Sequence, residues 1–198
     1  MSISEIIRYV YVTIGISLIF FVPLICMRNK FFSKRNEGSH WKYELTDLVF
    51  IFYIICLYQI TALRFGGIGW SFENMVERQT RVNAIPLVIL WQWVEKGVWW
   101  HLFYNVVGNC IWFVPLGVLL PAIYRSYRKH LGRTVFIGLM VSTSIEILQF
   151  VLCTGVTDID DVIFNTFGTA MGYLIWTIID FVRIFIKKQI KKRKDSLD

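Results

Sequence analysis

The sequence predicts an all-α integral membrane protein with about five transmembrane helices and an external interfacial helix or re-entrant segment. Composition is the first reason. Of 198 residues, 56% are hydrophobic and only 18% are charged, and the mean hydropathy is +0.53, whereas soluble domains carry about a quarter charged residues. The second reason is that apolar residues gather in runs of about 20, the length at which a helix crosses about 30 Å of hydrocarbon. Together these observations exclude an ordinary soluble enzyme.

Five runs are long enough to span a membrane, at 8–27, 45–64, 102–123, 134–153 and 162–185. The first run is too long for the apolar part of a signal peptide and has no small-residue cleavage pattern, so we expect it to be retained. Between the second and third runs, the apolar piece Ile85–Trp100 is interrupted by Gln92, Glu95 and Lys96 and is rich in tryptophan. That pattern favours an interfacial helix or a re-entrant stretch over a sixth span.

Lys and Arg gather in alternate connections between the predicted spans. The 28–43 loop, the 124–133 loop and the tail after 186 are basic, whereas the 65–101 connection balances its charges. The turn before the fifth span carries aspartates and no basic residue. Because basic loops stay on the cytoplasmic side, we expect the N-terminus outside and the C-terminus in the cytoplasm. The net charge of +7 then marks orientation and contact with acidic phospholipid, and we expect no nucleic acid partner.

Three of the predicted spans carry polar side chains that are costly in hydrocarbon, at about 2.5–3.5 kcal/mol for a central charge. The third span has three of them on one face, the fourth has a carboxylate and an amide one turn apart, and the fifth begins with three aspartates. The candidate ligand-binding residues are His101, Asn105, Asn109, Glu146, Gln149, Asp158, Asp160, Asp161 and Asn165.

Depth along the helices brings these residues together. At about 1.5 Å per residue, Asn109 lies roughly 12 Å below the external surface, Glu146 about 10 Å and Asn165 about 6 Å. We therefore predict one polar cavity open to the external side. A structural alternative stays open, because amides in membrane helices commonly join neighbouring helices. Asp158 or Asp160 can likewise cap the fifth helix, which makes Asp161 the better site candidate of the three.

Glycines in two of the predicted spans favour close helix packing, because a residue without a side chain lets backbones approach. The fifth span has a GxxxG pair, and the third has two further glycines. The four positions are Gly108, Gly117, Gly168 and Gly172.

Three motifs follow one another over the second half of the chain: Asn105-x3-Asn109-x3-Phe113-x-Pro115-Leu-Gly117, Glu146-x2-Gln149, and Asp158-Ile-Asp160-Asp161-x3-Asn165-Thr-x-Gly168-x3-Gly172. In order, spacing and residue type they resemble the VanZ-like family of small bacterial membrane proteins, with a fainter match at Asn83-Ala-Ile-Pro86. Many members have an arginine shortly before the first aspartate, where this chain has Thr154, Gly155 and Val156.

The resemblance implies a single membrane domain over 1–198 in the bacterial cytoplasmic membrane, with a motif-bearing core at about 80–185 and a basic tail at 186–198. It also implies a contribution to resistance against glycopeptides of the teicoplanin type. We expect the cavity to engage a membrane-anchored ligand, either a lipoglycopeptide or a lipid-linked cell-wall precursor. Membrane lipids are the other expected partner, and no cofactor is expected.

An intramembrane enzyme acting on a lipid or a lipid-linked intermediate is the main alternative. Glu146 would be its acid or base and Asp161 a second catalytic candidate, which with Asn165 could hold a divalent cation. Against it, His101 is the only histidine near the predicted site, no Ser–His pair is evident and the sequence has no HExxH spacing, so we favour a binding protein without a metal. A transporter is disfavoured because no inverted repeat is evident and the polar residues stop in the outer half.

Overall fold

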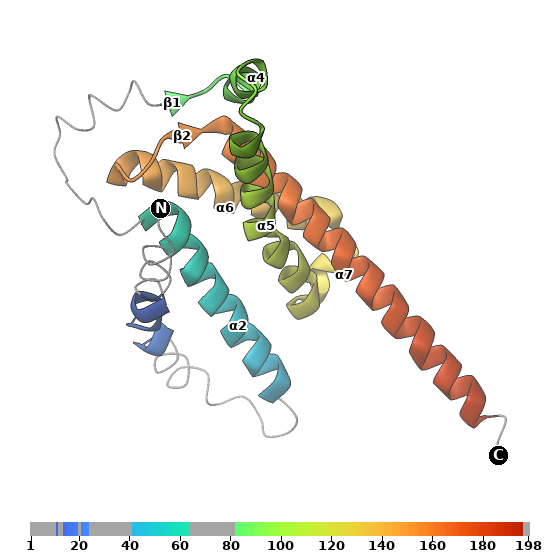
Figure 1. Ribbon diagram of the computed structural model, residues 1–198. Helices are drawn as coiled ribbons and strands as arrows, with labels where there is room; N and C mark the ends of the chain where they lie inside the picture. The colour runs from blue at the N-terminus through green and yellow to red at the C-terminus, as the bar shows by residue number, and fades with distance from the viewer. Residues whose placement is uncertain (1–10, 12–13, 20, 24–40, 64–81, 196–198) are drawn as a thin grey trace. The chain divides into compact units, whose positions relative to one another are not determined.

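The computed structural model describes residues 11, 14–19, 21–23, 41–63 and 82–195 (Figure 1). The elements from residue 41 on, in chain order, are α2 (Trp41–Tyr58), the π-helical turn η1 (Gln59–Leu63), β1 (Val82–Asn83), α4 (Val88–Glu95), α5 (Trp99–Ile123), the 3-10 turn η3 (Arg125–Tyr127), α6 (Leu131–Leu152), β2 (Thr157–Asp158) and α7 (Ile159–Lys194). The strands have two residues each. The predicted all-α class is therefore confirmed.

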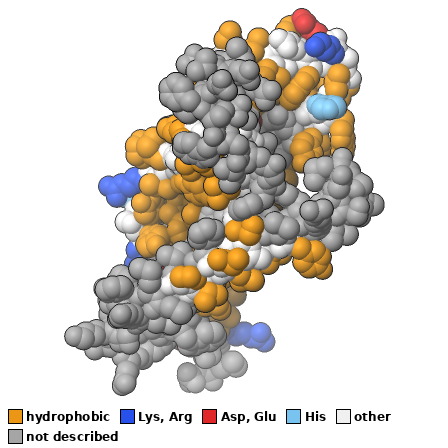
Figure 2. All heavy atoms as spheres, turned by 90° about the vertical axis from the view of Figure 1, so that its left-hand side faces the viewer, with side chains coloured by type: hydrophobic (Ala, Val, Ile, Leu, Met, Phe, Trp, Pro, Cys, Tyr) orange, Lys and Arg blue, Asp and Glu red, His pale blue; other side chains and the backbone are white. Residues whose placement is uncertain are grey.

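Four helices of the described chain are long and apolar enough to cross a membrane: Leu45–Leu63, Trp99–Ile123, Leu131–Leu152 and Ile159–Arg193. They confirm the second to fifth predicted spans, with ends shifted by a few residues. Most described residues of the first predicted span, 8–27, belong to a short apolar helix, Ile14–Pro23, and the rest of that span lies outside the described residues. Figure 2 shows hydrophobic side chains over much of the described surface on the face it presents, as expected of helices that meet lipid.

The chain divides into two compact units, one formed by 1–84 with 143–158 and the other by 85–142 with 159–198. In the first unit, one side-chain hydrogen bond joins the second half of α6 to α2. The hydroxyls of Tyr58 and Ser144 are hydrogen-bonded at 2.5 Å. β1 and β2 pair in parallel, with Val82 opposite Thr157.

In the second unit, α5 and α7 pack with their backbones in close contact, as Figure 1 shows along the two helices. A methyl group added at Gly117, Gly168 or Gly172 would overlap backbone atoms of the facing helix. These three glycines confirm the predicted close packing. Gly108 does not, because a side chain there would meet nothing within 4 Å. The prediction for Gly108 was wrong, because close packing requires atoms of another helix beside the glycine and no atom of the described residues lies there.

The predicted external segment forms the eight-residue helix α4, which a short turn joins to α5. The turn contains Gly97 with a φ of 67°, a conformation that glycine adopts without strain. Eight helical residues are only about 12 Å long. The interpretation of this segment as something other than a sixth span is therefore confirmed.

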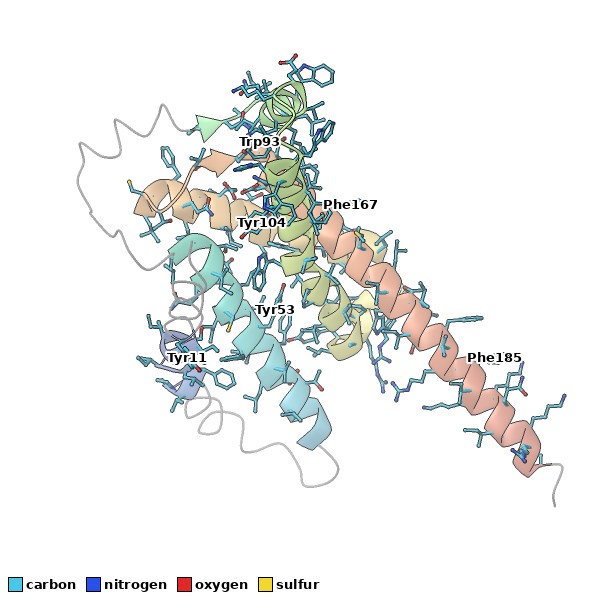
Figure 3. The ribbon with its side chains drawn as sticks, in the orientation of Figure 1. Tyr11, Tyr53, Trp93, Tyr104, Phe167 and Phe185 are labelled. Atoms are coloured by element: carbon cyan, nitrogen blue, oxygen red, sulfur yellow. The ribbon has the colours of Figure 1, made fainter. Side chains whose placement is uncertain are left out.

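Helix α7 has 36 residues and so is about 54 Å long, more than the roughly 30 Å of a hydrocarbon core. Its residues 181–190 are all exposed. The part that carries Phe185 runs on past the end of α5 (Figure 3). The predicted fifth span, 162–185, thus lies inside a longer continuous helix.

Candidate functional site

An amide–carboxylate cluster joins α5 to the first turn of α7 in the second unit. The Asn109 side-chain nitrogen donates to the Asn105 oxygen at 3.0 Å and also to the Asp161 carboxylate. The two asparagines lie one helical turn apart on one face of α5, as their spacing predicted. All three side chains are half-buried. We call Asn105, Asn109 and Asp161 the polar cluster.

The aromatic residues of α4 and of the first turns of α5 lie at the same end of the second unit as the polar cluster. Figure 3 shows Trp93 on α4 and Tyr104 on α5 at this end. The His101 ring contacts the Trp93 ring, with centroids 6.3 Å apart. His101 itself is exposed and lies one turn before Asn105. The structure therefore places His101 with the aromatic residues. Asn105 and Asn109 lie one and two turns further along α5.

Asp160 lies beside Asp161 in the chain but has a different partner. Its carboxylate accepts a hydrogen bond from the Leu87 backbone N–H at 2.6 Å, and only 3% of the residue is exposed. Leu87 is the residue before α4 and has a φ of 63°. Consecutive aspartates of α7 therefore hold the start of α4 and the middle of α5.

Glu146 and Asp158 belong to the first unit. Asp158 is part of β2, and Glu146 on α6 is hydrogen-bonded to it. The Glu146 carboxylate accepts a hydrogen bond from the Asp158 backbone N–H at 2.8 Å, and Glu146 is 4% exposed. The Asn83 side-chain nitrogen donates to the Asp158 carboxylate at 2.8 Å. These bonds tie the segment after α6 to the residues just before α4.

Gln149 and Asn165 each make one interhelical hydrogen bond, within different units. The Gln149 nitrogen donates to the Thr61 carbonyl at 2.9 Å in the π-helical turn. The Asn165 nitrogen donates to the Ser142 hydroxyl at 2.9 Å, and both of these residues are buried. Both bonds are of the kind that joins neighbouring membrane helices.

Sequence reasoning missed two residues. Gln59 begins the π-helical turn, is 2% exposed, and has no partner for either side-chain polar atom in the described part of the chain. It is a polar residue inside a predicted span, and that signal could have found it. Leu87 was missed as well, because an apolar residue gives no sign of a left-handed backbone.

The polar cluster offers both donors and acceptors to a ligand. Within the described residues, the Asn105 nitrogen and the Asn109 oxygen have no hydrogen-bond partner, so a donor and an acceptor stay available. Asp161 adds a carboxylate. Among the described residues, no group of three or more His, Cys, Asp or Glu side chains could hold a metal ion. The available donor and acceptor of the two asparagines can pair with neutral polar groups such as amides and sugar hydroxyls.

Apolar helices of spanning length that carry such polar groups define a multi-pass membrane protein. Residues 50–180 match the VanZ/LLP1 family, and the chain belongs to that family, which confirms the resemblance seen in the motifs. A curated relative, Protein VanZ of Enterococcus faecium, is 36% identical over 74 residues. The match covers 37% of this chain and 45% of the relative, so it spans less than half the relative's length. No solved structure matches the chain.

Proposed function

We propose that this protein contributes to bacterial resistance against glycopeptide antibiotics of the teicoplanin type by engaging a membrane-anchored ligand at the polar cluster. Membership of the VanZ/LLP1 family supports the role in glycopeptide resistance. The likeness to a protein named VanZ supports it as well. The ligand is a lipoglycopeptide or a lipid-linked cell-wall precursor, each of which combines a lipid tail with amide and sugar groups.

The observation that carries the proposal is the position of the polar cluster relative to the aromatic residues. Trp99 and Trp100 open helix α5 and are exposed, and Asn105 and Asn109 follow one to three turns later. Aromatic residues at a helix end favour the membrane–water interface. A ligand anchored in the bilayer by its tail would meet these aromatic residues first and the amides of the cluster next.

The proposed orientation puts this end of the second unit outside the cell. It has the N-terminus outside and the C-terminus in the cytoplasm. The basic residues of the 124–133 loop and of the end of α7 support that direction, because basic segments stay in the cytoplasm. The end of α5 that carries the aromatic residues then faces the outer leaflet, where a glycopeptide would meet the membrane.

Replacing the central amide tests the proposal. Asn109→Leu removes both hydrogen bonds at similar volume, and we expect teicoplanin protection in a susceptible host to fall to the level of the empty vector. Ile111→Ala is the matched control, since Ile111 lies on the same helix and is exposed. Protein levels in the membrane are measured for both. Full protection by Asn109→Leu at wild-type protein levels would overturn the proposal.

Binding to the purified full chain in nanodiscs separates the two ligands. One arm uses teicoplanin and the other a lipid-linked cell-wall precursor. Saturable binding in one arm that Asn109→Leu abolishes and Ile111→Ala keeps identifies the ligand. Equal binding by both variants would place the ligand elsewhere.

A further inference from the structure

The backbone at Leu87 is strained and is held by a buried carboxylate. Leu87 has a φ of 63°, in the left-handed region that residues with a side chain rarely adopt. Its N–H donates to Asp160, whose carboxylate lies 2.6 Å away and is buried. A hydrogen bond to an ionised acceptor is among the strongest in proteins. Such a backbone conformation persists only where the surroundings hold it, and the bond to Asp160 is one such constraint.

The strained residue starts the segment that carries the exposed aromatic side chains. Helix α4 begins directly after Leu87. Three residues separate the end of α4 from Trp99, where α5 begins. Backbone hydrogen bonds close this turn, among them the Val98 N–H to the Trp93 carbonyl at 2.9 Å. The bond to Asp160 therefore holds the N-terminal end of this segment. The C-terminal end of the segment runs directly into α5.

Exposed aromatic side chains lie on α4 and on the first turns of α5. Trp91 is 64% exposed and Trp100 73% exposed. The rings of Trp100 and Phe103 are stacked with centroids 6.2 Å apart. We define the aromatic surface as Trp91, Trp99, Trp100, Phe103 and Tyr104, all of which are exposed.

We propose that the aromatic surface is a preformed lipid-binding face and that Asp160 is the residue that positions it at the boundary between headgroups and acyl chains. Three observations favour lipid as the partner. Trp99 opens a helix of spanning length, and we expect the first residue of such a helix where hydrocarbon meets water. Tryptophan and tyrosine rings favour that boundary because they combine an apolar body with a polar group. Glu95 and Lys96, at the end of α4, are exposed. Charged side chains beside the aromatic surface are expected on the water side of that boundary.

The inference goes beyond the proposed function, because it concerns the bilayer and does not depend on which antibiotic or precursor is bound. A second copy of the chain is the other partner an exposed aromatic surface could have. Interfaces between proteins bury such rings away from lipid, whereas the lipid-binding face predicts direct contact with headgroups. The two partners are therefore separated by measuring the distance between lipid and ring.

The experiment measures lipid contact at Trp91 directly. The full chain is labelled with 5-fluorotryptophan and placed in phosphatidylcholine nanodiscs that contain a spin label at the headgroup or deep in the acyl chain. The variants Trp91→Phe and Trp176→Phe assign the two fluorine signals. We expect headgroup labels to broaden the Trp91 signal more than acyl-chain labels do. No broadening of Trp91 by either label would overturn lipid as the partner, and a concentration-dependent Trp91 shift without broadening would point to a second copy.

Substitutions at both ends of the bond test the positioning role. Asp160→Ala should abolish the preference of Trp91 for the headgroup label, whereas Asp160→Asn keeps an acceptor oxygen and should retain it. Leu87→Gly keeps the N–H and adopts the same backbone without strain, so it should behave as wild type. Leu87→Pro has no N–H and a φ near −65°, so it should behave as Asp160→Ala does.

The Trp176 signal reports on folding, because Trp176 is buried and lies on α7 far from Asp160 in the sequence. If Asp160→Ala shifts the Trp176 signal as well, the comparison of Leu87→Gly with Leu87→Pro tests the positioning role instead. An unchanged Trp91 response in both Asp160→Ala and Leu87→Pro would overturn the positioning role. Asn109→Leu should leave the Trp91 response unchanged even where it abolishes protection, so failure of this inference and failure of the proposed function are distinguishable.

Discussion

Asn109 donates its side-chain amide to the carboxylate of Asp161, which ties the middle of α5 to the first turn of α7. The same nitrogen also donates to Asn105, so one amide connects a second residue of its own helix face with a carboxylate on α7. Between these helices, glycines bring the backbones into close contact. The carboxylate is therefore held by a closely packed helix pair.

We expect Asn109 and Asp161 to be energetically coupled. A hydrogen bond to a charged group contributes about 1.5–3 kcal/mol in soluble proteins, and interhelical bonds in membranes average about 0.6 kcal/mol. A double-mutant cycle with Asn109→Ala and Asp161→Ala should thus give a coupling of about 1–2 kcal/mol. Thermal unfolding in detergent measures it. Additive effects of the two substitutions would show that the bond contributes nothing to stability.

The glycines of α5 and α7 provide a test with an internal control. Gly172→Ala places a methyl group against the Val114 backbone, which cannot move without shifting α5. Overpacking of this kind typically costs about 1–3 kcal/mol. Gly108→Ala, in open space, should stabilise the helix by about 0.5–1 kcal/mol. Unfolding temperatures of the two variants should therefore move in opposite directions, and a parallel change would contradict the helix contact.

Glu146 is expected to act through its hydrogen bond to the Asp158 N–H. Glu146→Gln keeps an acceptor oxygen and should preserve the bond, whereas Glu146→Leu leaves the N–H without it at a cost of about 1–3 kcal/mol. Hydrogen exchange at the Asp158 amide checks this. We expect faster exchange in Glu146→Leu and near wild-type exchange in Glu146→Gln. Equal exchange in all three proteins would show that the carboxylate does not hold this strand.

The spans could be predicted from the sequence because their lengths follow from the thickness of the bilayer. The polar side chains on those spans could be predicted as a group for a related reason, since polarity in an apolar run is visible without a structure. The hydrogen-bond partners of these side chains could not be predicted. Asp160 and Asp161 are neighbours in the sequence, yet one binds the Leu87 backbone and the other binds Asn109.

Side-chain direction depends on packing that a single sequence does not record. The error at Gly108 has this origin, since glycine in a span indicates helix contact only where another helix lies opposite. The two-residue pairing of β1 with β2 is another example, because pairs this short leave no alternating pattern. That the nine candidate residues line one external cavity stays a prediction.

Gln59 gives the sharpest stability prediction, because removing a polar group should strengthen the protein. Its amide is buried and has no hydrogen-bond partner among the described residues, and such a group costs about 1–3 kcal/mol. Gln59→Leu should therefore raise the unfolding temperature.

Gln149→Leu is the matched control for Gln59→Leu, since it loses the bond to the Thr61 carbonyl and should lower the unfolding temperature. Both glutamines are buried and both lie in spans, so hydrophobicity alone predicts the same sign for the two variants. Opposite signs would show that hydrogen bonding decides. A destabilising Gln59→Leu, with Gln59→Met destabilising as well, would indicate that the amide binds a polar group such as an internal water in the π-helical turn.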